Sequence, residues 1–147
     1  MRPLPLLLGS CLAGGLVLAA FADGPADNIP DKVRPVPPPG IMVPDADRAE
    51  LENGLADLEK SIAALRPKAP AAPYLPDVEI YAKAVRYALQ GGEFFAPGDI
   101  TKAKNLLKVA EDRCDALENG RPTWVLQSGP TALGYVSQID GSVQPYG

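Results

Sequence analysis

The sequence of 147 residues contains no histidine. This absence removes the usual general base, the commonest zinc ligand and the middle member of a Ser-His-Asp triad. There is also no glycine-flanked serine of the nucleophile-elbow type and no glycine-rich phosphate loop. Gly141-Ser142 comes nearest, but it lacks the second glycine and is typical of a turn. We therefore predict no catalytic, cofactor-binding or metal-binding residue in this chain, and no activity of the chain by itself.

Cysteine is almost as scarce, with only Cys11 and Cys114. Cys11 lies in the N-terminal 22 residues, so no intramolecular disulfide can form in the rest of the chain. Cys114 lies in an apolar helical stripe without a histidine, which indicates a small buried side chain rather than a nucleophile. Without Arg2 the remaining chain has 13 basic and 18 acidic residues and a net charge near −5. No basic patch is available to bind nucleic acid.

Residues 1–22 have the pattern of a secretory signal peptide. A basic start at Arg2 is followed by an apolar run over residues 4–20 and by the small-x-small ending Ala20-Phe21-Ala22. We expect cleavage after Ala22 and export to the periplasm or the medium, which leaves no integral membrane span.

Two alternatives compete with a cleaved signal. A retained anchor is less favoured, because glycine and serine interrupt an apolar run that is marginal for the roughly 20 residues a membrane span needs. Lipidation of Cys11 is the other alternative, because Leu8-Gly9-Ser10-Cys11 resembles a bacterial lipoprotein box. The apolar run continues beyond Cys11, where such proteins normally become polar.

Proline divides the next part of the chain. Residues 23–44 contain seven prolines and predict an extended linker, or an arm lying on another surface. Residues 67–76 form a second linker, rich in proline and alanine. Between them, residues 45–66 predict an amphipathic helix with a capping-box-like start at Asp47 and Glu50. Its apolar stripe is Leu51, Leu55, Leu58, Ile62 and Leu65.

This stripe leaves the oligomeric state open. It spans fewer than three heptads, whereas a coiled coil usually sustains about three or four. Packing within the same protein is therefore favoured over a coiled-coil dimer.

Residues 77–120 predict a helical hairpin. Asp77 is expected to cap the first helix, and Asp99 is expected to start the second. Phe94 and Phe95 are expected to fill the open end at the bend. The first helix has two apolar sides: one can meet the second helix, and the other, with Ile80, Ala84 and Tyr87, needs a partner.

Two groups of side chains in this region suggest binding sites, although simpler interpretations are favoured. One group of carboxylates lies on a single helix and therefore cannot wrap a calcium ion as a loop does. The aromatic residues suggest a carbohydrate platform, but several have the spacing of core residues. The carboxylates are Glu111, Asp112, Asp115 and Glu118, and the aromatic residues are Tyr74, Tyr81, Tyr87, Phe94, Phe95 and Trp124.

Residues 121–147 have the composition of β structure. Residues 133–139 have strand composition, and Asp140-Gly141 predicts a hairpin with a type I′ turn. Pro145 restricts the returning strand to an edge. The expected fold is mainly α with a short β-hairpin that begins a sheet not completed in this chain, an α+β fragment.

Three stretches carry a resemblance to a known family. They are LPDVEIYAKAVRYAL at 75–89, GEFFAPGDITKAKNLL at 92–107 and GYVSQIDGSVQPYG at 134–147. Over residues 74–147 the chain resembles the N-terminal region of secreted bacterial α/β-hydrolases of the prolyl oligopeptidase-like peptidase and esterase group. The resemblance implies a helical hairpin and a β-hairpin that precede a hydrolase domain.

The same resemblance implies a serine nucleophile, an acid and a histidine, all of them outside this chain. The chain is thus expected to be a non-catalytic accessory region that packs on a following hydrolase domain. The alternative from the residues themselves is a small exported helical protein that acts by binding.

Overall fold

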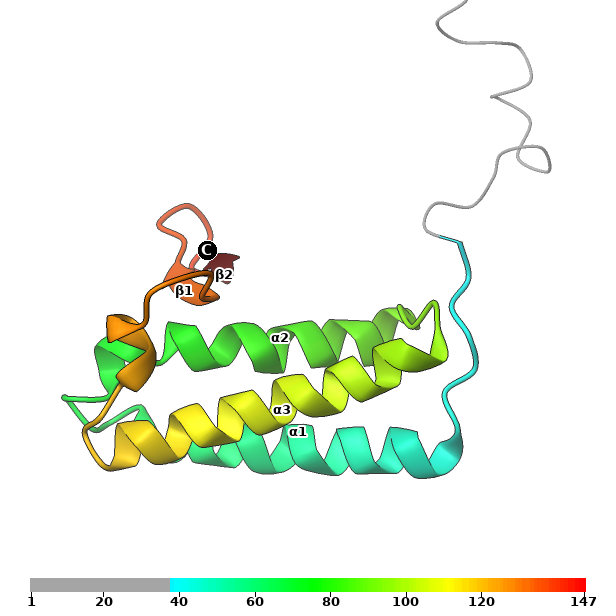
Figure 1. Cartoon of the computed structure of the whole chain (residues 1–147), viewed down its shortest axis with the longest axis horizontal. Helices are drawn as coiled ribbons and strands as arrows, with labels where there is room; N and C mark the ends of the chain where they lie inside the picture. Colours follow the sequence, from blue (N-terminus) through cyan, green and yellow to red (C-terminus); the bar gives the residue numbers. More distant parts are fainter. Residues whose placement is uncertain (1–37) are drawn as a thin grey trace, which may run out of the picture. The chain divides into compact units, whose positions relative to one another are not determined.

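The computed structural model describes residues 38–147 (Figure 1). These residues are mainly helical with one short antiparallel pair of strands, which confirms the predicted fold class. The signal expected at 1–22, Cys11 and most of the proline-rich linker lie outside the described residues. The elements are α1 (Asp45–Leu65), η2 (Ala72–Tyr74), α2 (Pro76–Gly91), α3 (Pro97–Glu118), η3 (Thr123–Leu126), β1 (Leu133–Val136) and β2 (Val143–Tyr146).

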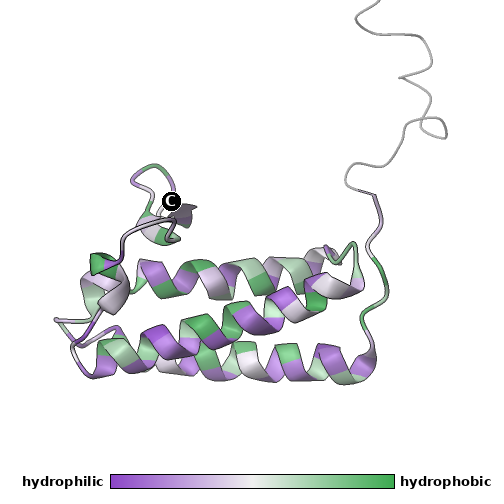
Figure 2. Cartoon of the chain, in the orientation of Figure 1, coloured by the Kyte–Doolittle hydropathy of each residue, from purple (hydrophilic) through white to green (hydrophobic). Residues whose placement is uncertain are grey.

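The three α-helices form a bundle in which each helix contacts the other two. Consecutive helices run in opposite directions, and the hairpin of β1 and β2 packs on α2 (Figure 1). Hydrophobic and hydrophilic residues alternate along all three helices (Figure 2), as expected for helices that bury one side. The largest fully buried side chains in this core are Leu51, Leu58, Leu65, Val78, Val85 and Phe94.

Helix α1 buries its predicted stripe within the same chain. Four of its five residues are buried and Leu55 is partly buried. Gly54 lies where α1 approaches α3, because a Cβ there would stand 3.0 Å from Cδ1 of Leu107. Glycine disfavours a helix locally, but at position 54 it allows α1 and α3 to approach closely.

The predicted capping box at the start of α1 is wrong. The residue before the helix is Pro44, and no side chain caps the free N–H groups. Instead, Asp47 and Glu50 both accept hydrogen bonds from Nζ of Lys104 on α3, at 2.8 and 2.6 Å. These two carboxylates tie α1 to α3 rather than closing the first turn of α1.

The bend between α2 and α3 buries one of the two phenylalanines expected there. Phe94 is 1% exposed, whereas Phe95 is 46% exposed. The carbonyl of Phe94 also accepts a hydrogen bond from the backbone N–H of Ile41, at 2.6 Å. Val43 is buried as well. The end of the proline-rich segment therefore lies on the bundle.

The second apolar side of α2 is covered in part by the chain itself. Ile80 is buried, and the hairpin packs on this helix, whereas Ala84 and Tyr87 are exposed. The need for an outside partner is thus smaller than the sequence suggests.

The hairpin forms where predicted, but its turn is not type I′. Ser137 donates its N–H to the carbonyl of Ser142, so the loop contains the four residues 138–141. Of these only Gly141 has a positive φ, of 69°, whereas a type I′ turn needs two such residues. Asp140 stabilises the loop with its side chain, which accepts hydrogen bonds from the N–H and the hydroxyl of Ser142, at 3.1 and 2.8 Å.

Candidate functional site

The described residues do not assemble a catalytic pair. Burial is the main cause that raises the pKa of Cys114 to about 11, so its thiol stays protonated at neutral pH and is a poor nucleophile. The hydroxyl of Ser142 donates to Asp140, and this bond is the main cause that lowers the pKa of Asp140. A carboxylate with a lowered pKa is a weak general base. Neither residue has the partner that nucleophilic catalysis needs.

The residues considered for calcium and carbohydrate binding lie partly on the surface and partly in the core. All four carboxylates on α3 are exposed, and within 38–147 no three acidic, cysteine or histidine side chains could share a metal ion. Three of the six aromatic residues, Tyr81, Phe94 and Trp124, are buried, whereas Tyr87 and Phe95 are about half exposed. The aromatic residues therefore serve mainly the core, as their spacing indicates.

Asp77 is the predicted residue whose position differs most from expectation. It does not cap α2, which begins at Pro76, and it is only 7% exposed. Its Oδ2 accepts a hydrogen bond from Nε1 of Trp124 at 2.9 Å, and its Oδ1 accepts one from the backbone N–H of Gly134 at 2.7 Å. The first turn of α2 also favours a negative charge at this position, through the helix dipole. Asp77 thus joins α2 to η3 and to β1.

Arg113 completes this buried polar cluster and was not found by sequence reasoning. It is 7% exposed, and its Nη1 donates to the carbonyls of Asp77 and Ala132, at 2.7 and 2.9 Å. The guanidinium lies between two aromatic rings, 4.9 Å from the centre of Tyr81 and 4.8 Å from that of Trp124. Such cation–π contacts stabilise a buried cation. The only signal in the sequence was a basic residue beside the apolar stripe of α3.

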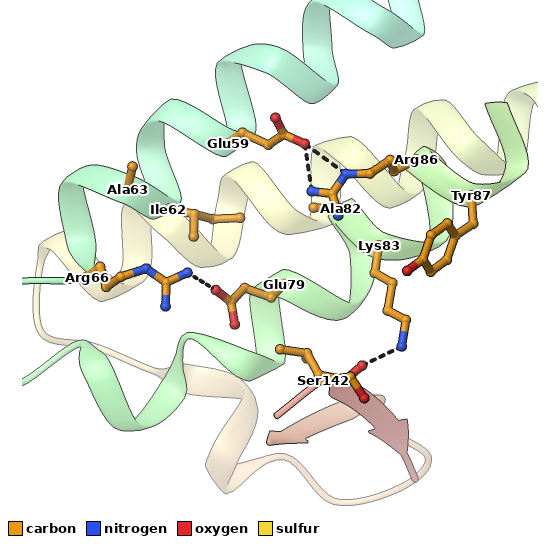
Figure 3. Close-up of a pocket in the computed structure, with 11 residues that line it drawn as sticks. Glu59, Ile62, Ala63, Arg66, Glu79, Ala82, Lys83, Arg86, Tyr87 and Ser142 are labelled. Atoms are coloured by element: carbon orange, nitrogen blue, oxygen red, sulfur yellow. Dashed lines mark hydrogen bonds and ion pairs between the residues drawn. The ribbon is translucent and has the colours of Figure 1, made fainter. Parts of the chain in front are cut away.

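A charged groove of about 430 Å³ lies between α1, α2 and the hairpin (Figure 3). Arg86 on α2 donates through Nε and Nη2 to Oε1 of Glu59 on α1, at 3.1 and 2.6 Å. Arg66, at the end of α1, and Glu79 on α2 form a second ion pair. Since both arginines pair with carboxylates, these contacts fasten α1 to α2 and leave little free charge for a ligand.

Lys83 closes the groove on the side of the hairpin. Its Nζ donates to the carbonyl of Val143 at 2.7 Å and lies 5.8 Å from the centre of the Tyr87 ring. Figure 3 shows Lys83 pointing towards the hairpin, away from Glu59 and Arg86. Its contact with Val143 therefore holds β2 on α2.

The hairpin carries several apolar side chains that are open to solvent. We call Tyr135, Val136, Ile139 and Tyr146 the hairpin surface; Ile139 is 98% exposed and the other three are about half exposed. The pairing of Leu133 with Tyr146 and of Tyr135 with Gln144 places both tyrosines on one face of the sheet. Their rings meet edge to face, with centroids 6.0 Å apart. This face carries no charged side chain.

Comparison with known protein families, with curated proteins and with solved structures found no match to this chain. Among residues 38–147, no helix has both the length and the hydrophobicity to cross a membrane.

Proposed function

We propose that this chain is a non-catalytic accessory region of an exported serine hydrolase that acts on peptide or ester bonds. The observation that carries the proposal is the hairpin surface. Its two paired tyrosines, Tyr135 and Tyr146, place two half-exposed aromatic rings side by side on one face of the sheet. Apolar side chains gathered at the surface of a protein are typical of a contact with another protein surface. The partner that we propose is the hydrolase domain itself.

Two further features support this assignment. The hairpin surface belongs to the stretch GYVSQIDGSVQPYG, which resembles the segment that precedes the catalytic domain in prolyl oligopeptidase-like hydrolases. The sequence contains no histidine, which suits a supporting role. The pattern of residues 1–22 favours export of the whole protein.

A second candidate function is that of a small exported protein that acts by binding alone. The bundle favours it, because its core is built from the chain's own residues. In that case the hairpin surface would contact a separate protein.

The absence of chemistry in this chain can be tested with the purified full chain. We expect no covalent labelling by a fluorophosphonate probe and no hydrolysis of p-nitrophenyl esters above buffer, because no serine has a histidine partner. Ser142→Ala is the matched control and should behave identically. Stoichiometric labelling that disappears in Ser142→Ala would contradict a non-catalytic role.

A further inference from the structure

Several polar contacts attach the C-terminal segment, residues 121–147, to the helices. The carboxylate of Asp77 holds Trp124 through one oxygen and Gly134 through the other. Arg113 holds the carbonyl of Ala132 while its guanidinium stacks on the ring of Trp124. We call Asp77, Arg113 and Trp124 the latch.

The segment contributes little to the hydrophobic core. Of the buried apolar residues of the described chain, only Trp124 comes from residues 121–147. Leu133 and Val143 are partly buried and pack against the core from outside. The three helices, the connections between them and the segment before α1, by contrast, supply the other nineteen buried apolar residues. The hairpin thus supplies no fully buried side chain to the core of the bundle.

The hairpin has little stability of its own. Each strand has four residues, and the sheet has only these two strands. An isolated two-stranded hairpin of this size is marginally stable at best in water. Once it leaves α2, its cross-strand hydrogen bonds should therefore open as well.

The contacts of the latch also depend on one another. A buried charge is tolerated only while it is hydrogen bonded. Both partners of the Asp77 carboxylate belong to the C-terminal segment, and so do one hydrogen bond and one ring contact of Arg113. If one partner leaves, a buried ion loses a hydrogen bond and water must enter. The contacts are therefore expected to break together.

From these observations we propose that the latch gives residues 121–147 two states, docked on the helices and released from them, while the three-helix bundle stays folded. Release frees the outer edges of the hairpin. Gly134 N–H loses Asp77 at the edge of β1, and Val143 C=O loses Lys83 at the edge of β2. The latch thus controls whether these backbone groups are available to a partner strand.

Hydrogen exchange measured by NMR on the full chain tests this proposal. Asp77→Asn keeps the shape of the side chain, but replaces one acceptor oxygen by an amide that faces an N–H donor. Trp124→Phe removes the indole N–H and keeps an aromatic ring. In both variants we expect exchange of the Ser137 amide, which bonds across the hairpin, to rise by about tenfold or more, whereas amides in the middle of α1 and α3 change by less than about twofold.

The tryptophan provides a second measurement. Trp124 is the only tryptophan in the chain and is 4% exposed, so its emission should shift to longer wavelength in Asp77→Asn. Glu59→Gln is the control, because it breaks an exposed ion pair with Arg86 on α2, the helix that also carries Asp77, and leaves the latch intact. Unchanged exchange at Ser137 in both latch variants would overturn the proposal. Equal acceleration of the hairpin and the helices, or loss of helical structure, would also overturn it, since the segment and the bundle would then unfold as one unit.

Discussion

Phe94→Ala is expected to lower the free energy of unfolding by about 3–5 kcal/mol, the usual range for a buried phenylalanine. Phe94 is 1% exposed and lies at the bend between α2 and α3, where the segment before α1 also joins the bundle. Truncation removes apolar contacts and leaves a cavity that the bend cannot close without moving a helix. Urea denaturation followed by circular dichroism gives the change in unfolding free energy.

The neighbouring Phe95 provides a matched control, because it has the same chemistry and is 46% exposed. Phe95→Ala should cost about 1 kcal/mol or less, as is usual for surface positions. Equal losses in the two variants would contradict the burial of Phe94 and with it the described bend.

Gly134→Ala is expected to displace β1 from α2 and to lower the unfolding free energy by about 3 kcal/mol, at the upper end of the range for overpacking. A Cβ at position 134 would overlap the backbone carbonyl of Pro76 and stand 3.0 Å from the backbone nitrogen of Asp77. These are backbone atoms at the start of a helix, so no side-chain rotation can relieve the clash. Loss of the Gly134 N–H bond to Asp77 should follow, visible as a shift of the Trp124 emission.

Gly98→Ala is the control for this substitution. Gly98 lies in the first turn of α3, and a Cβ there meets no atom within 4 Å. Replacing glycine by alanine at such a position restricts the unfolded chain and should raise the unfolding free energy by about 0.4–1 kcal/mol. If the two substitutions had the same effect, the close approach of β1 to α2 would be wrong.

The helices were predictable because their signals are local. The apolar stripe of α1, the proline-rich boundaries and the glycines after α2 and α3 lie within a few residues of the elements they define. The burial of Cys114 followed from the same periodicity. The hairpin was found in the same way, from the local signal at Asp140-Gly141.

The roles of Asp77, Asp47 and Glu50 were not predictable for the opposite reason. Each stands where a helix cap is expected, but each binds a partner more than 40 residues away in the sequence: Trp124 for Asp77 and Lys104 for the other two. A local rule does not identify such partners. Arg113 was missed because a charged residue near an apolar stripe is normally solvated. The rings of Tyr81 and Trp124 and the carbonyls of Asp77 and Ala132, all distant in the sequence, make its burial favourable.

The charged groove is another place where the sequence does not reveal the partners of charged residues. Its basic residues could suggest an anion site, yet Arg66 and Arg86 are matched by Glu79 and Glu59 from the facing segment. Exposed pairs of this kind contribute little stability individually. Their role is to align α1 with α2, while the hairpin surface remains the best candidate for contact with another domain.

The accessory role in a serine hydrolase is the central claim, and the native protein tests it most directly. The periplasm and the medium of the producing cells are treated with a fluorophosphonate probe, and an antibody against the three-helix bundle then captures the polypeptides that contain it. Mass spectrometry identifies any labelled serine. The account predicts a captured serine hydrolase whose labelled serine lies outside these 147 residues. Capture of the bundle without any labelled hydrolase would contradict it.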